Sequence, residues 1–70
     1  MKLSQKERIL LWFESHETLT RLEAFTELGI FEAPARISEL KKDGHNITTV
    51  LERGISSYGY PFQSAIWRLV

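Results

Sequence analysis

The segment that decides the fold runs from Leu19 to Ile47 and reads LTRLEAFTELGIFEAPARISELKKDGHNI. Near its start, Thr20 and Glu23 form a capping box, in which the hydroxyl and the carboxylate accept hydrogen bonds from backbone N–H groups at a helix start. Gly29 then supplies the left-handed residue that commonly ends a helix. The spacing predicts a short helix over residues 21–28, with one apolar face made of Leu22, Ala24, Phe25 and Leu28.

A second helix follows within the same segment. Pro34 has no N–H and fits only the first turn of a helix, and Gly44 ends the pattern. We therefore expect a helix over residues 33–43, whose core face is Ala33, Ile37 and Leu40. Two short capped helices joined through Gly29 and Ile30 are typical of a helix-turn-helix, in which the first helix braces the second against the major groove of DNA, although the turn here is about two residues longer than usual.

Upstream of this segment, Ser4 and Glu7 form another capping box, which predicts a helix over residues 5–15. At 100° per residue its apolar side chains form one arc, made of Ile9, Leu10, Trp12 and Phe13. Leu11 projects from the opposite side and has no core to enter. Because DNA-binding modules often pair to bind two half-sites, Leu11 is a candidate dimer contact; a single exposed leucine is the alternative interpretation.

Downstream of the segment the period changes from helical to two, which indicates strands. Residues 47–52 alternate as a half-buried strand, and residues 65–70 can place Ala65, Trp67 and Leu69 on an inner face. The connection from Gly54 to Ser64 is rich in Gly, Ser and Pro, so we expect a hairpin with a long tip. The predicted fold is α+β: three helices followed by a two-stranded hairpin.

Composition excludes several classes of protein. Seventy residues make one small domain, and the chain has no cysteine, which removes disulfides, thiolate nucleophiles and common zinc sites and favours a cytoplasmic location. The longest apolar run, residues 9–13, is too short for a membrane span.

The sequence also lacks motifs for a metal site or for catalysis. His16 and His45 do not have the spacing of metal ligands, and there is no nucleophile elbow, phosphate loop or paired acid and base. We expect no metal, no cofactor and no catalysis.

The nine basic and nine acidic residues cancel, but the two halves of the chain differ. Residues 1–35 carry four basic and six acidic side chains, a net charge of −2, whereas residues 36–70 carry five basic and three acidic ones, a net charge of +2. A surface for a polyanion is therefore expected in the second half.

The block from Leu19 to Gly29, followed by the block from Ala35 to Gly44, resembles the small winged helix-turn-helix domains common among phage-encoded proteins, and Trp67–Leu69 resembles their closing strand. The resemblance implies that the hairpin is a wing. It also implies DNA binding in a phage or prophage setting, as a transcriptional regulator or as a recombination-directionality factor resembling excisionases, inside a bacterial host cell.

The candidate DNA-binding residues lie on the outer face of the predicted third helix and on the hairpin. On the helix, Ala35 and Ser38 are small enough for close approach to bases, and basic side chains can reach phosphates or a guanine edge. On the hairpin, a basic residue and hydroxyl groups could follow the backbone or enter the minor groove. The full set is Pro34, Ala35, Arg36, Ser38, Lys41, Lys42, Arg53, Ser56, Ser57 and Tyr58.

The aromatic hairpin tip also allows a different function. Tyr58, Tyr60 and Phe62 fall within five residues, and exposed aromatic side chains are enriched in protein interfaces. The alternative is therefore a winged-helix interaction module that captures a host or phage protein, or a second copy of itself, with Tyr60, Phe62 and Leu11 as contacts. A mobile loop without function is the third interpretation of the tip.

Overall fold

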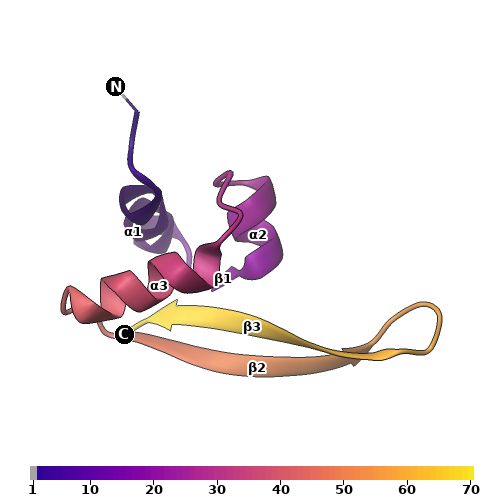
Figure 1. Cartoon of the computed structure of the whole chain (residues 1–70). Helices are drawn as coiled ribbons and strands as arrows, with labels where there is room; N and C mark the ends of the chain where they lie inside the picture. Colours follow the sequence, from indigo (N-terminus) through magenta and orange to yellow (C-terminus); the bar gives the residue numbers. More distant parts are fainter. Residues whose placement is uncertain (1) are drawn as a thin grey trace.

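The computed structural model describes residues 2–70, which form three helices and three strands (Figure 1). In chain order the elements are α1 (Gln5–Ser15), β1 (Thr18–Thr20), α2 (Arg21–Thr26), α3 (Ala33–Lys42), β2 (Ile47–Ile55) and β3 (Pro61–Leu69). The predicted α+β fold, with three helices and an antiparallel hairpin, is confirmed. The short strand β1 was not predicted.

Both predicted capping boxes are present. The Glu7 N–H donates to Ser4 Oγ at 3.1 Å, and the Ser4 N–H donates to Glu7 Oε1 at 3.0 Å. Because the carboxylate accepts that bond, the pKa of Glu7 is lowered from its ordinary value. The same exchange joins Thr20 and Glu23 at 3.1 and 2.9 Å. The two boxes fix where α1 and α2 begin.

α2 ends at Thr26, two residues earlier than predicted. The chain then turns at Gly29, whose φ of 67° is a conformation that favours glycine, and the Ile30 N–H donates to the Ala24 carbonyl at 2.9 Å. Arg8 of α1 supports the same turn, since its Nη1 donates to the Leu28 carbonyl at 2.6 Å. The turn between α2 and α3 is therefore fixed by a hydrogen bond back to α2 and by a hydrogen bond from α1.

The core lies between the helices and the inner part of the sheet. Its buried members are Ile9, Leu19, Ala24, Ile30, Ala33, Ile37, Leu40, Ile47 and Trp67. The predicted core face of α3 is confirmed in full, and the predicted apolar arc of α1 packs on this core. The predicted apolar face of α2 is wrong in part: Leu22 is 71% and Phe25 54% exposed, because only one side of this six-residue helix meets the rest of the molecule.

The sheet has the order β1-β3-β2, and both pairings are antiparallel. β1 pairs with β3 from Thr18 opposite Arg68 to Thr20 opposite Ile66. Of the predicted inner residues of β3, Trp67 is buried and Ala65 partly buried, but Leu69 is exposed because it lies at the end of the strand, beyond the pairing with β1.

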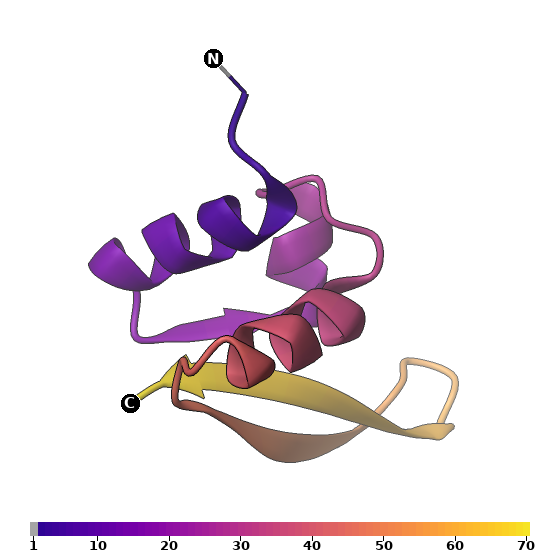
Figure 2. The ribbon, with the colours of Figure 1, turned by 60° about the vertical axis from the view of Figure 1, so that its left-hand side comes forward.

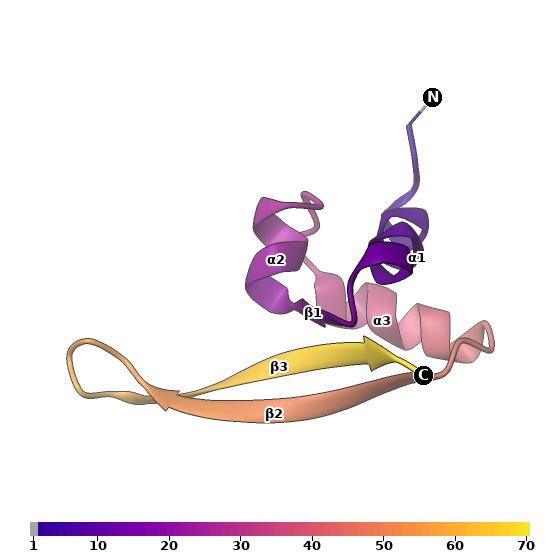
Figure 3. The same ribbon diagram turned by 180° about the vertical axis from the view of Figure 1, so that it is seen from behind.

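Beyond this three-stranded part, β2 and β3 continue as a two-stranded ribbon that extends away from the helices (Figures 1 and 3). We call residues 52–64 of this ribbon the wing. The expected long loop from Gly54 to Ser64 is wrong, because pairing continues to Ile55 opposite Pro61. The expectation that residues 47–52 form a half-buried strand fails beyond Ile47: Thr49 and Leu51 are exposed, because the described helices do not cover this part of β2.

Candidate nucleic-acid interface

α3 lies along the inner part of the sheet and presents its outer face with none of the described elements in front of it (Figures 1 and 2). Because Ala33, Ile37 and Leu40 point into the core, the helical period turns the other side outward. Glu39, which is half-buried, lies at one edge of this side. The predicted site residues on it are Pro34, Ala35, Ser38, Lys41 and Lys42. All are exposed except Ala35, which is half-buried. The structure thus brings five of the predicted site residues together, in what we call the α3 face.

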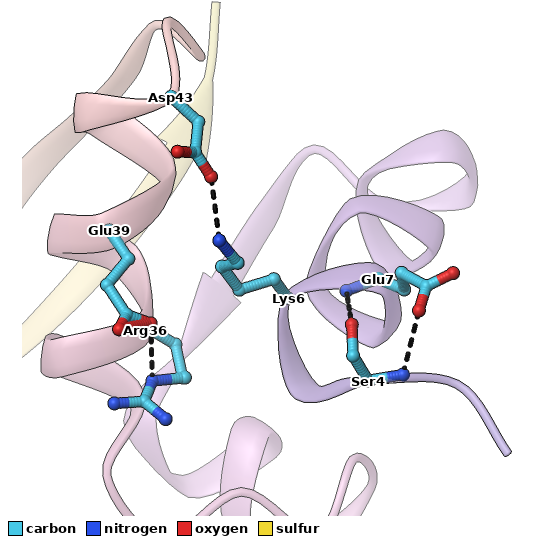
Figure 4. Close-up of polar contacts among 6 residues, drawn as sticks. All are labelled: Ser4, Lys6, Glu7, Arg36, Glu39 and Asp43. Carbon is cyan, nitrogen blue, oxygen red and sulfur yellow. Dashed lines mark hydrogen bonds and ion pairs between the residues drawn. The ribbon is translucent and has the colours of Figure 1, made fainter.

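One flank of α3 faces α1, and acidic side chains are neutralised there (Figure 4). Lys6 Nζ lies 2.8 Å from Asp43 Oδ2, and Arg36 Nε lies 2.9 Å from Glu39 Oε1. The hydrogen bond from Lys6 and its charge lower the pKa of Asp43, and the same contact raises the pKa of Lys6. Arg36 therefore lies apart from the α3 face and is paired with Glu39, although its N–H is not well directed at the carboxylate.

The other flank of α3 faces β2. Lys41 Nζ donates to Thr49 Oγ1 at 3.3 Å, which holds the ammonium group above the base of the ribbon. Lys42 is exposed and forms no ion pair within residues 2–70. Thr49 was not among the predicted site residues, although its alternation with the core residue Ile47 placed it on the helix side of the strand.

The same alternation decides where Arg53 lies. Thr49 pairs with the buried Trp67, and Arg53 is four residues further along β2, so both belong to the side of the ribbon that faces the helices. Glu52 belongs to the opposite side. The cations Lys41 and Arg53 are therefore on the same side of the ribbon as the exposed face of α3.

The tip of the wing is a tight turn rather than a loop. The Gly59 N–H donates to the Ser56 carbonyl at 2.9 Å, the Ser56 N–H to the Tyr60 carbonyl at 2.8 Å, and the Tyr60 N–H to Ser56 Oγ at 3.1 Å. Gly59 has a φ of 86°, as expected for a turn followed by a bulge. The predicted contact Ser56 is thus used within the turn, whereas Ser57, Tyr58 and Tyr60 are exposed.

Phe62 has a role within the wing. It pairs with Gly54 across the ribbon, and its ring covers the glycine so closely that a Cβ there would lie 2.5 Å from Phe62 Cζ. An aromatic ring over a cross-strand glycine supplies the packing that the glycine itself lacks. Phe62 as a whole remains 50% exposed.

Two apolar surfaces lie outside the α3 face. Leu11 is exposed, as predicted, beside a shallow groove that includes Leu3 and Leu10. The second surface was missed, because Leu22 and Phe25 were expected in the core. They line an open groove of about 340 Å³ together with Arg21, Phe31 and Ser64, and the Phe25 and Phe31 rings meet edge to face at 5.8 Å.

Within residues 2–70, no three His, Asp or Glu side chains come together in a way that could hold a metal ion. None of the helices in this part of the chain is long and apolar enough to cross a membrane.

The fold and the exposed α3 face define a helix-turn-helix protein with a β-ribbon wing. The family model of the winged helix-turn-helix domain matches residues 4–63, and the chain belongs to this family. No curated protein and no solved structure matches the chain. Winged helix-turn-helix domains are typically DNA-binding modules without enzymatic activity, so the family suggests a DNA partner.

Proposed function

We propose that the protein binds double-stranded DNA specifically, with α3 in the major groove and the wing on the flanking backbone. The observation that carries this proposal is the α3 face, where small residues lie beside two lysines and the acidic neighbour, Glu39, is paired with Arg36. Ala35 and Ser38 allow close approach to base edges, and Lys41 and Lys42 reach phosphates on either side.

The same proposal gives the wing a positioning role. Arg53 lies on the same side of the ribbon as Lys41, so both cations contact the duplex that α3 enters. Ser57 and Tyr58 add hydroxyl groups near the tip. Arg36 contributes a phosphate contact once it is released from Glu39, because a phosphate oxygen can replace the carboxylate as its partner.

In this proposal the protein acts by occupying a DNA site and catalyses no reaction. We infer a role as a transcriptional regulator or as a recombination-directionality factor resembling excisionases, in a phage or prophage and inside the bacterial host cell. The protein acts as a dimer on two half-sites, with the exposed Leu11 in the contact between copies.

Fluorescence anisotropy with fragments of the source genome at two salt concentrations, with random-sequence competitor, tests this function. A protein that makes three to five phosphate contacts loses affinity with a log–log salt slope of about −0.9 per contact. Lys42→Glu removes one cation of the α3 face and is expected to weaken binding by roughly ten-fold and reduce this slope by about one.

Lys2→Glu is the matched control, because it makes the same charge change at an exposed residue before α1. The proposed α3 interface is contradicted if the two variants bind DNA equally well. Light scattering of Leu11→Glu tests the dimer separately, and a mass equal to that of the wild type removes Leu11 from the contact between copies.

The exposed tyrosines of the tip favour a second candidate function, capture of a host or phage protein. An aromatic protein interface responds weakly to salt, whereas a phosphate interface responds steeply. A folded protein that binds no duplex at either salt concentration would favour this second function.

A further inference from the structure

The tip of the wing has an unusual composition for a DNA-contacting segment. Residues 54–62 read GISSYGYPF and contain no charged side chain. The exposed fractions are 89% for Tyr58, 73% for Ile55 and 72% for Tyr60. Such side chains cannot neutralise phosphates, so the tip is suited to a contact that depends on apolar area and aromatic rings.

This apolar tip is also preformed. The three hydrogen bonds within Ser56–Tyr60 close the turn, and the ring of Phe62 packs over Gly54 directly below it. A segment that is already ordered loses little conformational entropy when it binds. The tip can therefore act as a fixed projection.

The length of the ribbon sets how far this projection reaches from Lys41. Lys41 of α3 contacts Thr49, and Thr49 lies six residues before Ile55 on β2. At roughly 3.3 Å per residue the tip begins about 20 Å beyond that contact. Along B-form DNA, a major groove and the neighbouring minor groove are half a turn apart, about 17 Å. In Figures 1 and 3 the wing extends past the N-terminal end of α3, whereas Lys41 lies near its C-terminal end.

We propose that the tip is an aromatic wedge that enters the minor groove next to the α3 site and bends the duplex there. This inference rests on the proposed DNA binding. Apolar side chains that enter a minor groove separate neighbouring base pairs and kink the duplex toward the major groove. Tyr58, the most exposed side chain of the tip, leads the wedge, and Tyr60 lies beside it.

The wedge predicts a sequence preference at a base step that α3 does not contact. Pyrimidine–purine steps such as TA unstack more easily than other steps, so a TA step under the tip lowers the energy of bending. Arg53, at the start of the wing, remains a phosphate contact. The salt dependence of binding therefore comes from the cations, whereas the bend comes from the tyrosines.

The test uses the full chain and a short duplex selected from random DNA by the wild-type protein. Dyes at the two ends report bending by energy transfer, and 2-aminopurine beside the TA step fluoresces when its base unstacks. We expect wild type to bend the duplex and raise the 2-aminopurine signal. Tyr58→Ala is expected to lose most of both signals and to bind about ten-fold more weakly, since stacking of one aromatic ring on a base has this order of effect.

The salt slope separates a wedge from a phosphate contact. Tyr58→Ala removes no cation, so its salt slope should equal that of wild type, whereas Lys42→Glu should reduce the slope. Tyr58→Phe keeps the ring and should keep the bend. Because Tyr58 is so exposed, both variants should fold normally, which circular dichroism checks.

Each other outcome overturns the wedge. If Tyr58→Ala and the double variant Tyr58→Ala/Tyr60→Ala bend the duplex as wild type does, DNA binding stands and the wedge fails. If those variants change the mass measured by light scattering but leave bending unchanged, the tip contacts a second copy and the wedge fails. If wild type binds no duplex, the proposed function and the wedge fail together.

Discussion

The body of the protein and its wing are stabilised by different means. In the body, side chains from all three helices and from the sheet are buried around Trp67 and Leu40. In the wing, most side chains on both sides of the ribbon are exposed, and the structure is fixed by cross-strand pairing, by the turn at Ser56–Tyr60 and by the Phe62 ring over Gly54. A ribbon that needs no core leaves its apolar side chains free for a partner.

The largest effect is expected where the body depends on one buried side chain. Trp67→Ala should destabilise the protein by about 3–5 kcal/mol, because it removes a large ring from the core and leaves a cavity. Urea unfolding followed by circular dichroism measures the change. Ile55→Ala, in the exposed wing, is the matched control and should change stability by less than about 0.5 kcal/mol.

If the wing depended on the core of the body, mutations in the two regions would destabilise the protein to a similar extent. Equal losses of stability in Trp67→Ala and Ile55→Ala would contradict the distinction drawn between the two regions. Trp67→Phe serves where the alanine variant does not fold, since it keeps an aromatic ring at the same place and should lose less stability.

A smaller, local effect is expected at the wing turn. Gly59→Ala places a Cβ on a residue with a φ of 86°, which costs an L-residue about 1–2 kcal/mol. Because the turn lies outside the core, hydrogen exchange should accelerate at the Ser56 and Gly59 amides while the core amides of α3 change little. Faster exchange throughout α3 would show that the wing and the body unfold as one unit.

The smallest effect is expected at the ion pair between α1 and α3, which is exposed. Lys6 lowers the pKa of Asp43, so the pair stabilises the fold above the ordinary carboxyl value of 3.8, and this contribution is lost as the pH falls through the lowered value. The pKa of Lys6 is raised, so at the alkaline end the contribution is lost only above its ordinary value of 10.5.

Thermal unfolding of Asp43→Asn and of wild type, at pH 6 and below pH 3, tests whether the stability contributed by the ion pair is lost in acid. The difference in Tm between the two proteins should be small at pH 6 and should shrink in acid, where Asp43 of the wild type becomes protonated. A difference that grows in acid would contradict this account of the pair.

The parts of the fold that could be predicted from sequence are those specified by neighbouring residues. Thr20 with Glu23 marks a helix start in any context, and the spacing of Ala33, Ile37 and Leu40 gives one buried face that the structure confirms. The exposed side of α3 followed directly from that face, so most of the candidate interface on this helix could be inferred before the fold was known.

The rest depends on partners far away in the chain. Leu22 and Phe25 occupy one helical face, but periodicity does not show whether another element covers that face, and here none of the described elements does so fully. The length of the ribbon was missed for a similar reason, since Gly54 indicates a turn until Phe62 is known to lie opposite it. Arg36 is a local exception: it has the charge expected for a DNA contact, but it pairs with Glu39 three residues along the same helix, and that pairing depends on the rotamers of both side chains.

The short strand β1 has a consequence for how the chain folds. Thr20 is both the last residue of β1 and the N-cap of α2, and β1 pairs with residues 66–68 at the other end of the described chain. This pairing closes a loop of most of the chain, and loops of this kind raise the contact order and slow folding. We expect β1 to dock late, so that α2 gains its fixed orientation only after β3 is in place.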